Sequence, residues 1–137
     1  MDINGMFQGL SVSASALRAE RARMGLIAQN ISQASVTDRG DGTPYRRKEA
    51  VFESVLDGAL AGGVQVAEVV EDEMTPMVRQ YRPGHADADA TGMVTLPNVN
   101  TAFEMVDLMQ SARAYEANLE AMQMQMRMVE KALELGR

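Results

Sequence analysis

One short loop combines side chains from which a cation site could be built. It reads GHADADATG and holds the single histidine, His85, close to Asp87 and Asp89. Carboxylates two residues apart, followed by a glycine, resemble the start of a calcium-binding loop. The third ligand position holds Thr91, however, and the position that needs a bidentate glutamate holds Asn98. The loop is therefore interpreted as an acidic turn before a strand.

Four closely spaced methionines form a second candidate site. Residues 122–128 read MQMQMRM. Thioether sulfurs can bind copper(I) where a flexible or extended segment lets several of them converge. The surrounding sequence has helical spacing, and on a helix these methionines point to different sides. They are therefore interpreted as packing residues, with Met122 and Met126 on one side and Met124 and Met128 on another.

The other residue types give no support for catalysis. The chain has no cysteine, and no serine and acid are arranged around its histidine. The segments GDG and AGG lack the spacing and the strand–helix setting of a phosphate-binding loop. We therefore expect no enzymatic activity, no cofactor, no metal and no small-molecule substrate.

The overall composition favours packing between helices or between subunits. The chain has 137 residues, of which 46% are hydrophobic but only 4% aromatic, with no tryptophan. Large rings normally supply much of the buried area of a compact core. Burial between helices or between subunits is therefore favoured over a thick core within one chain.

The charge and hydropathy patterns exclude two kinds of partner. A net charge of −6 argues against nucleic acid, which binds basic surfaces. The only basic run, residues 46–48, is followed by Glu49 and is interpreted as a solvated face. No segment approaches the roughly 20 apolar residues of a membrane helix. The N-terminal segment also lacks the basic and apolar regions of a cleaved Sec signal, so we expect a protein that is not membrane-inserted.

Two long helices are expected to carry these residues, one at each end of the chain. Residues 98–135 contain no proline or glycine, and their apolar residues alternate at spacings of three and four, as in a heptad seam. Residues 3–34 show a similar pattern, which ends at the turn-forming run TDRGDGTPY. We expect the two helices to pair through one intrachain seam. Its predicted members are Leu10, Leu17, Met24, Ile31, Met105, Leu108, Ala112, Tyr115, Leu119, Met122, Met126, Val129 and Leu133.

Each helix also has a second apolar stripe, rich in small residues. A surface helix needs only one such stripe, so the second is expected to contact another subunit. Free monomers would expose it, and we expect their ends to be poorly ordered before assembly. The predicted intersubunit stripe consists of Val12, Ala19, Ala22, Leu26, Ala114, Ala117, Ala121, Met124, Met128 and Leu135.

The segment between the helices changes to short strands and loops. Strands are predicted at residues 45–53, 64–70, 77–83 and 93–97. The expected fold class is mainly α with a small β region: long N- and C-terminal helices paired as an antiparallel coiled-coil-like hairpin, with short β-strands and loops between them. The expected regions are an inner helical domain formed by the N-terminal helix (1–35) and the C-terminal helix (98–137), and a middle β/loop region (36–97).

Several segments resemble the bacterial flagellar basal-body rod protein family. LIAQNISQAS (26–35) resembles the N-terminal signature of flagellar axial proteins, and LPNVNTAFEMVDLMQSARAYEANLEAM (96–122) is similar to the C-terminal signature. TPYRRKEAVFE (43–53) and PGHADADATGMV (83–94) resemble the family's middle segments, although Ala86 replaces a usual proline and Met93 a usual tyrosine. The matching signature residues are Asn30, Ile31, Ala34, Pro97, Asn98, Val99, Glu104, Met105, Val106, Ser111, Arg113, Tyr115, Ala117 and Asn118.

The resemblance implies a structural subunit of the proximal rod. Such subunits pass through the flagellar type III export channel without a cleaved Sec signal. They polymerise through their terminal helices into an axial tube that encloses the export channel, spans the periplasm and transmits motor torque. The implied partners are other copies of the chain, rod proteins of the FlgB, FlgF and FlgG type, the adaptor FliE and the surrounding basal-body rings. The alternatives are a stand-alone helical adaptor or export-chaperone-like binding module, and a metal-binding protein.

Overall fold

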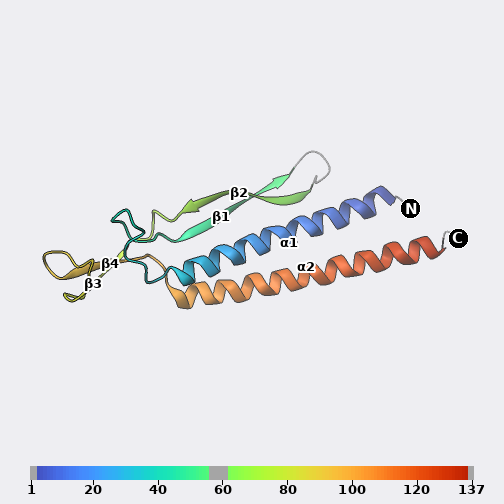
Figure 1. Cartoon of the computed structure of the whole chain (residues 1–137). Coiled ribbons are helices and arrows are strands. Elements are labelled where there is room, and N and C mark those ends of the chain that lie inside the picture. The colour runs from blue at the N-terminus through green and yellow to red at the C-terminus, as the bar shows by residue number, and fades with distance from the viewer. Residues whose placement is uncertain (1–2, 56–61, 136–137) are drawn as a thin grey trace.

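The computed structural model describes residues 3–55 and 62–135 and shows an elongated molecule with one long helix at each end of the chain (Figure 1). The predicted fold class, mainly α with a small β region, is confirmed. The terminal residues 1–2 and 136–137 of the predicted regions, and residues 56–61 of the middle region, lie outside the described residues. The elements are α1 (Ile3–Ser32), β1 (Lys48–Val55), β2 (Gly63–Glu71), β3 (Val78–Tyr81), β4 (Met93–Leu96) and α2 (Thr101–Leu135).

The two helices lie side by side and run antiparallel, so that both ends of the chain are at the same end of the molecule (Figure 1). The 35 residues of α2 extend over about 50 Å at 1.5 Å per residue. Asn100 caps this helix, because its Oδ1 accepts hydrogen bonds from the backbone N–H groups of Ala102 (3.0 Å) and Phe103 (3.3 Å). Helix α2 therefore begins just after Asn100.

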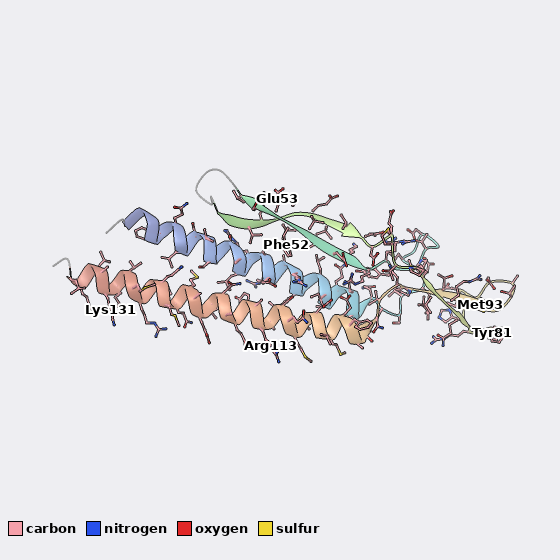
Figure 2. All side chains as sticks on the ribbon, turned by 180° about the vertical axis from the view of Figure 1, so that it is seen from behind. Phe52, Glu53, Tyr81, Met93, Arg113 and Lys131 are labelled. Carbon is pink, nitrogen blue, oxygen red and sulfur yellow. The ribbon has the colours of Figure 1, made fainter. Side chains whose placement is uncertain are left out.

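The β1–β2 hairpin covers the side of α1 that faces away from α2, giving three layers in the order hairpin, α1, α2 (Figure 1). The strands are antiparallel, with a bulge between Val51 and Phe52. Phe52 is half-buried, whereas the next side chain, Glu53, is exposed (Figure 2). The period-two alternation of the strand thus directs one face of the hairpin onto α1.

A second hairpin, β3–β4, lies beyond the helices at the end opposite the two termini (Figure 1). Its strands are antiparallel, with Val78 opposite Leu96 and Tyr81 opposite Met93. Val94 of β4 is buried, with 1% of its surface exposed, whereas every residue of β3 is exposed. Little of the described core lies in this hairpin, and the larger buried cluster lies where the helices meet the β region.

Candidate functional site

Asn30, near the end of α1, uses all the hydrogen-bonding capacity of its side-chain amide. Its Nδ2 donates to the backbone carbonyl of Lys48 (2.9 Å) and to Glu104 Oε2 (3.0 Å). Its Oδ1 accepts from the hydroxyl of Tyr45 (2.9 Å) and from the backbone N–H of Lys48 (2.9 Å). Asn30 is 1% exposed, so these bonds replace the water that burial removes. One side chain therefore joins α1, α2 and the start of β1.

Arg47 supplies the positive charge that Glu104 requires. Glu104 is 1% exposed, and its Oε1 accepts a hydrogen bond from Arg47 Nε. The guanidinium also lies near Asp72 (3.9 Å) and Asp107 (3.7 Å) and pairs with Glu49. A buried carboxylate without a cation would be costly, so Arg47 is a structural requirement. The interpretation of residues 46–48 as a solvated face is therefore wrong for Arg47.

Asn98 anchors the chain between the two sheets. Its Oδ1 accepts from the backbone N–H of Arg47 (2.8 Å), and its Nδ2 donates to the carbonyls of Asp72 (2.8 Å) and Thr75 (3.1 Å). The hydroxyl of Thr75 donates to Asp72 Oδ2 (2.6 Å), and the backbone N–H groups of Thr75 and Met74 donate to Oδ1. The Thr75 hydroxyl, together with these N–H groups, lowers the pKa of Asp72.

We call Asn30, Tyr45, Arg47, Asn98 and Glu104 the junction network. Burial raises the pKa of Tyr45, and the nearby carboxylates of Glu71 and Glu104 raise it further, so its phenol stays protonated and can donate to Asn30. The polar groups of the network bond to one another and to the backbone. This arrangement holds the helical hairpin to the β region, which is a structural role.

Polar residues also continue along the contact between the two helices. Ser13 Oγ lies 3.2 Å from Gln125 Oε1, and a Cβ added at Gly9 would lie 3.2 Å from Gln125 Nε2. Glu104 and Gln125 therefore both face α1, and Ser111 and Asn118 fall between them at seven-residue intervals. Ser111 is 0% exposed, and within the described residues its hydroxyl has no hydrogen-bond partner. The seam of α2 therefore alternates polar with apolar residues.

The predicted intrachain seam is wrong for part of α2. Met105, Leu119, Met126 and Leu133 are exposed by 50%, 38%, 48% and 61%. The physical reason is that the polar line of residues 104, 111, 118 and 125 occupies the side of α2 that faces α1. The four apolar residues are left at the edge of the contact. The remaining predicted seam residues of α2 are half-buried: Leu108, Ala112, Tyr115, Met122 and Val129.

On α1 the predicted seam lies beside the observed contacts. The side of α1 that meets α2 carries Gly9, Ser13 and Asn30. Two of the predicted residues, Leu10 and Ile31, each come one position after a residue of this line. All the predicted seam residues of α1 are half-buried: Leu10, Leu17, Met24 and Ile31. Their assignment to the intrachain seam stays a prediction.

The predicted intersubunit stripe of α1 is largely covered within the chain. A Cβ added at Gly62 would lie 4.0 Å from Val12, and Ala19 is buried. Leu26 lines a shallow cleft with residues of β1 that include Phe52. The β1–β2 hairpin lies on this side of α1 and Ala19 is buried within the chain, so the assignment of Ala19 to a contact with another subunit is wrong. Val12 and Leu26 are half-buried and Ala22 is exposed, and their assignment stays a prediction.

The predicted intersubunit stripe of α2 is mostly open. Met124 and Met128 are each 57% exposed and Leu135 is 89% exposed. Ala117 and Ala121 are exposed as well, and Ala114 is half-buried. Figure 2 shows that α2 has one side without a neighbouring element, from which Arg113 and Lys131 project. The methionines of MQMQMRM lie on this helix. Met122 and Met126 point to one side of it, and Met124 and Met128 point to another.

The carboxylates of the candidate calcium loop are engaged in the loop itself. Asp89 Oδ1 accepts from the hydroxyl of Thr91 (2.5 Å) and from the backbone N–H groups of Thr91 (2.8 Å) and Met93 (3.0 Å). Asp89 Oδ2 accepts from Arg79 (2.5 Å), and Asp87 accepts from Thr37 (2.6 Å). Bonds that favour the charged form, from the Thr91 hydroxyl above all, lower the pKa of Asp89 to about 2.

The described residues provide neither a metal-binding cluster nor a membrane-spanning helix. Residues 3–55 and 62–135 contain no group of three or more His, Asp or Glu side chains placed to hold a metal ion. In the same part of the chain, neither helix is both long enough and apolar enough to pass through a bilayer.

The sequence contains signals for some residues of the junction network but not for their roles. Asn30, Asn98 and Glu104 are among the signature residues of the rod-family resemblance. Tyr45 and Arg47 lie in the similar segment 43–53 but are not signature residues. One sequence signal could have located the seam of α2. Polar residues recur every seven positions at 104, 111, 118 and 125, and apolar periodicity alone does not reveal that these residues face α1.

The fold and the junction network define a structural protein built on a long helical hairpin. Residues 90–135 match the family model described as "Flagellar basal body rod FlgEFG protein C-terminal". The chain is 40% identical to the flagellar basal-body rod protein FlgC of Escherichia coli O6:H1 and to that of Salmonella typhimurium. In both cases 126 residues are compared, covering 91% of this chain and 93% of the relative. It is 39% identical to the FlgC protein of Bacillus subtilis strain 168, over 96% of this chain and 98% of the relative.

The chain belongs to the FlgC family of flagellar basal-body rod proteins. It is a structural subunit of the flagellar basal body and assembles with other rod components.

Proposed function

We propose that the chain polymerises through its terminal helices into the axial tube of the proximal rod. In this proposal the helices of residues 1–35 and 98–137 form the inner layer around the export channel, and residues 36–97 pack further out. The three-layer arrangement supports this division, because the hairpin covers only one side of the helix pair. Torque would then pass along many helix contacts rather than through one site.

The observation that carries the proposal is the uncovered stripe of α2. Met124, Met128 and Leu135 are exposed by 57%, 57% and 89%, although apolar side chains of this size gain about 1.5–3 kcal/mol each from burial. Ala117 and Ala121 on the same side would let another helix approach closely. A stripe of this kind is typical of an interface.

The neighbours of this stripe are proposed from the family rather than from contacts. We infer that they include other copies of the chain, rod proteins of the FlgB, FlgF and FlgG type, the adaptor FliE and the surrounding rings. Methionine suits such non-identical neighbours, because its flexible thioether fills irregular gaps. We also infer export by the flagellar type III route without a cleaved Sec signal, and neither catalytic activity nor a cofactor. The stand-alone adaptor is not favoured, since the relatives are rod proteins.

The substitution Met124→Lys tests the proposal in a flagellated bacterium that lacks its own copy of this protein. A charge in an apolar contact should block rod assembly, while the chain still appears among the exported proteins. Gln80→Lys is the matched control, because it adds the same charge to an exposed residue of β3, far from the helices. Normal motility and normal basal bodies in the Met124→Lys strain would contradict the proposal.

The free chain offers a second measurement. The proposed assembly role predicts incomplete helicity and weak melting cooperativity in circular dichroism of the dilute monomer. A stand-alone adaptor would instead give a soluble, cooperatively melting dimer at micromolar concentration.

A further inference from the structure

Helix α2 has a second uncovered face, separate from the intersubunit stripe. It contains those predicted seam residues that turn outward, together with residues one turn away. We call it the acidic–apolar face, and its members are Met105, Met109, Glu116, Leu119, Met126, Glu130 and Leu133. All are exposed, Met109 by 61%. Its charged members are both acidic, and Arg127 lies beside Met126 and Glu130 at its C-terminal part. Around Met109 and Glu116, a partner that is small in places and basic elsewhere fits it.

Helix α1 has one uncovered face with the complementary character. Its other sides meet α2 and the β1–β2 hairpin. We call it the basic face, and its members are Arg18, Arg21, Gly25, Ala28 and Ser32, all of them exposed. Its two charged members are both basic. Within residues 3–55 and 62–135, neither these arginines nor Glu116 takes part in an ion pair.

Gly25 gives the basic face a position without a side chain. A glycine inside a helix is less stable than alanine by about 1 kcal/mol. The contact between Gly9 and Gln125 explains the glycine there, but a Cβ added at Gly25 would meet nothing within 4 Å in its own chain. The small residues Gly25 and Ala28 therefore leave the helix backbone open to contact by a long side chain from another helix.

The spacing of the two faces gives a register. Arg18 and Gly25 are seven residues apart, and so are Glu116 and Met109. In an antiparallel contact, a methionine placed over Gly25 brings Glu116 beside Arg18. The same antiparallel register relates Asn30 to Glu104 inside the chain, so helices of adjacent copies can alternate side by side without an axial offset.

We propose that the acidic–apolar face of α2 docks on the basic face of α1 of a second copy, with Met109 over Gly25 and Glu116 paired with Arg18. The inference rests on the proposed function, because it assumes that the helices polymerise. The two faces differ, so the contact is heterologous and each copy still offers one free face to the next. Such a contact builds a wall of alternating α1 and α2 helices and does not close as a dimer.

A charge exchange tests the pairing. Arg18→Glu and Glu116→Arg each place like charges together, and each should reduce the number of basal bodies by at least about tenfold. The double variant restores an opposite pair and should recover assembly. Glu120→Arg, a matched control at an exposed position of α2 outside the face, should have little effect. Normal assembly of either single variant, or failure of the double variant, contradicts the proposal.

A cross-linking experiment locates the contact independently. The chain has no cysteine, so Gly25→Cys and Met109→Cys introduce the only thiols. In oxidised basal bodies the double variant should form a ladder of linked copies, whereas either single variant should stay free of ladders. Absence of the ladder in assembled basal bodies overturns the proposal and leaves the proposed function standing. Failure of the unmodified chain to enter basal bodies would instead remove the proposed function itself.

Discussion

Asn30 and Glu104 are 74 residues apart in the sequence, yet the amide of Asn30 donates a 3.0 Å hydrogen bond to the carboxylate of Glu104 inside the helical hairpin. The same carboxylate also accepts from Arg47, which comes just before β1. Pairing of the helices and docking of the β region therefore depend on the same buried groups. We expect the two events to occur together rather than one after the other.

The substitution Asn30→Asp should destabilise the chain strongly. The replacement has nearly the same shape, but it cannot donate to Glu104 or to the carbonyl of Lys48, and it places a second negative charge beside Glu104. We expect a loss of about 2–4 kcal/mol in the free energy of unfolding, measured by urea denaturation. Gln29→Glu makes the same chemical change at an exposed neighbouring residue and should stay within about 0.5 kcal/mol. Equal stability of the two variants would show that the network is not essential.

Arg47 and Glu104 should show strong coupling in a double-mutant cycle. Arg47→Met leaves the Glu104 carboxylate buried without its cation, which should cost about 3–5 kcal/mol. Adding Glu104→Gln removes the uncompensated charge and should recover part of this loss. Arg82→Met, at an exposed arginine, is the control. Additive effects of the two substitutions would exclude the ion pair as a source of stability.

The sequence was sufficient to predict the helices and the fold class, because apolar periodicity extends over many turns in both helices. It was not sufficient to place the seam. Apolar spacing assigned Met105 and Leu119 to the interior, whereas the structure buries Glu104 and Ser111 instead. A buried polar residue becomes favourable only through partners distant in sequence, and no local pattern reveals that Asn30 and Arg47 bond to Glu104.

The strand region shows the same limit. Strands were predicted near the observed positions, but β1 begins at Lys48 rather than at Tyr45. The side chain of Tyr45 is needed in the junction network, and this requirement overrides its tendency to extend a strand. The outward stripe of Met124 and Met128 could be predicted, because it is a second apolar stripe on a helix that needs only one to pack within the chain.

Gly92 should tolerate no side chain. Its φ is +78°, and an added Cβ would lie 2.9 Å from a ring carbon of Tyr81 and 3.1 Å from the Cβ of Pro83. Gly92→Ala should therefore destabilise the β3–β4 hairpin by about 1–3 kcal/mol. Gly84→Ala is the control, because a Cβ there meets nothing within 4 Å. Hydrogen exchange of the hairpin amides measures the effect, and equal protection in both variants would contradict the expected strain.

Asp89 should titrate at unusually low pH, and Thr91 should be the main reason. Hydrogen bonds from the Thr91 hydroxyl, and then from backbone N–H groups, lower the pKa of Asp89 from 3.8 to about 2. Because the folded-state pKa is depressed, the stabilisation is complete above the unfolded pKa of about 4 and is lost as the pH falls through about 2. We therefore expect the loop of residues 85–93 to loosen between pH 4 and pH 2.

The substitution Thr91→Val tests this cause without removing the carboxylate. Carboxyl chemical shifts from NMR should place the pKa of Asp89 closer to 3.8 in this variant, whereas Thr91→Ser keeps the hydroxyl and should leave the pKa near 2. The loop of the valine variant should then loosen at a higher pH than that of the serine variant. If both variants titrate alike, the backbone N–H groups and Arg79 control the carboxylate, and the hydroxyl does not.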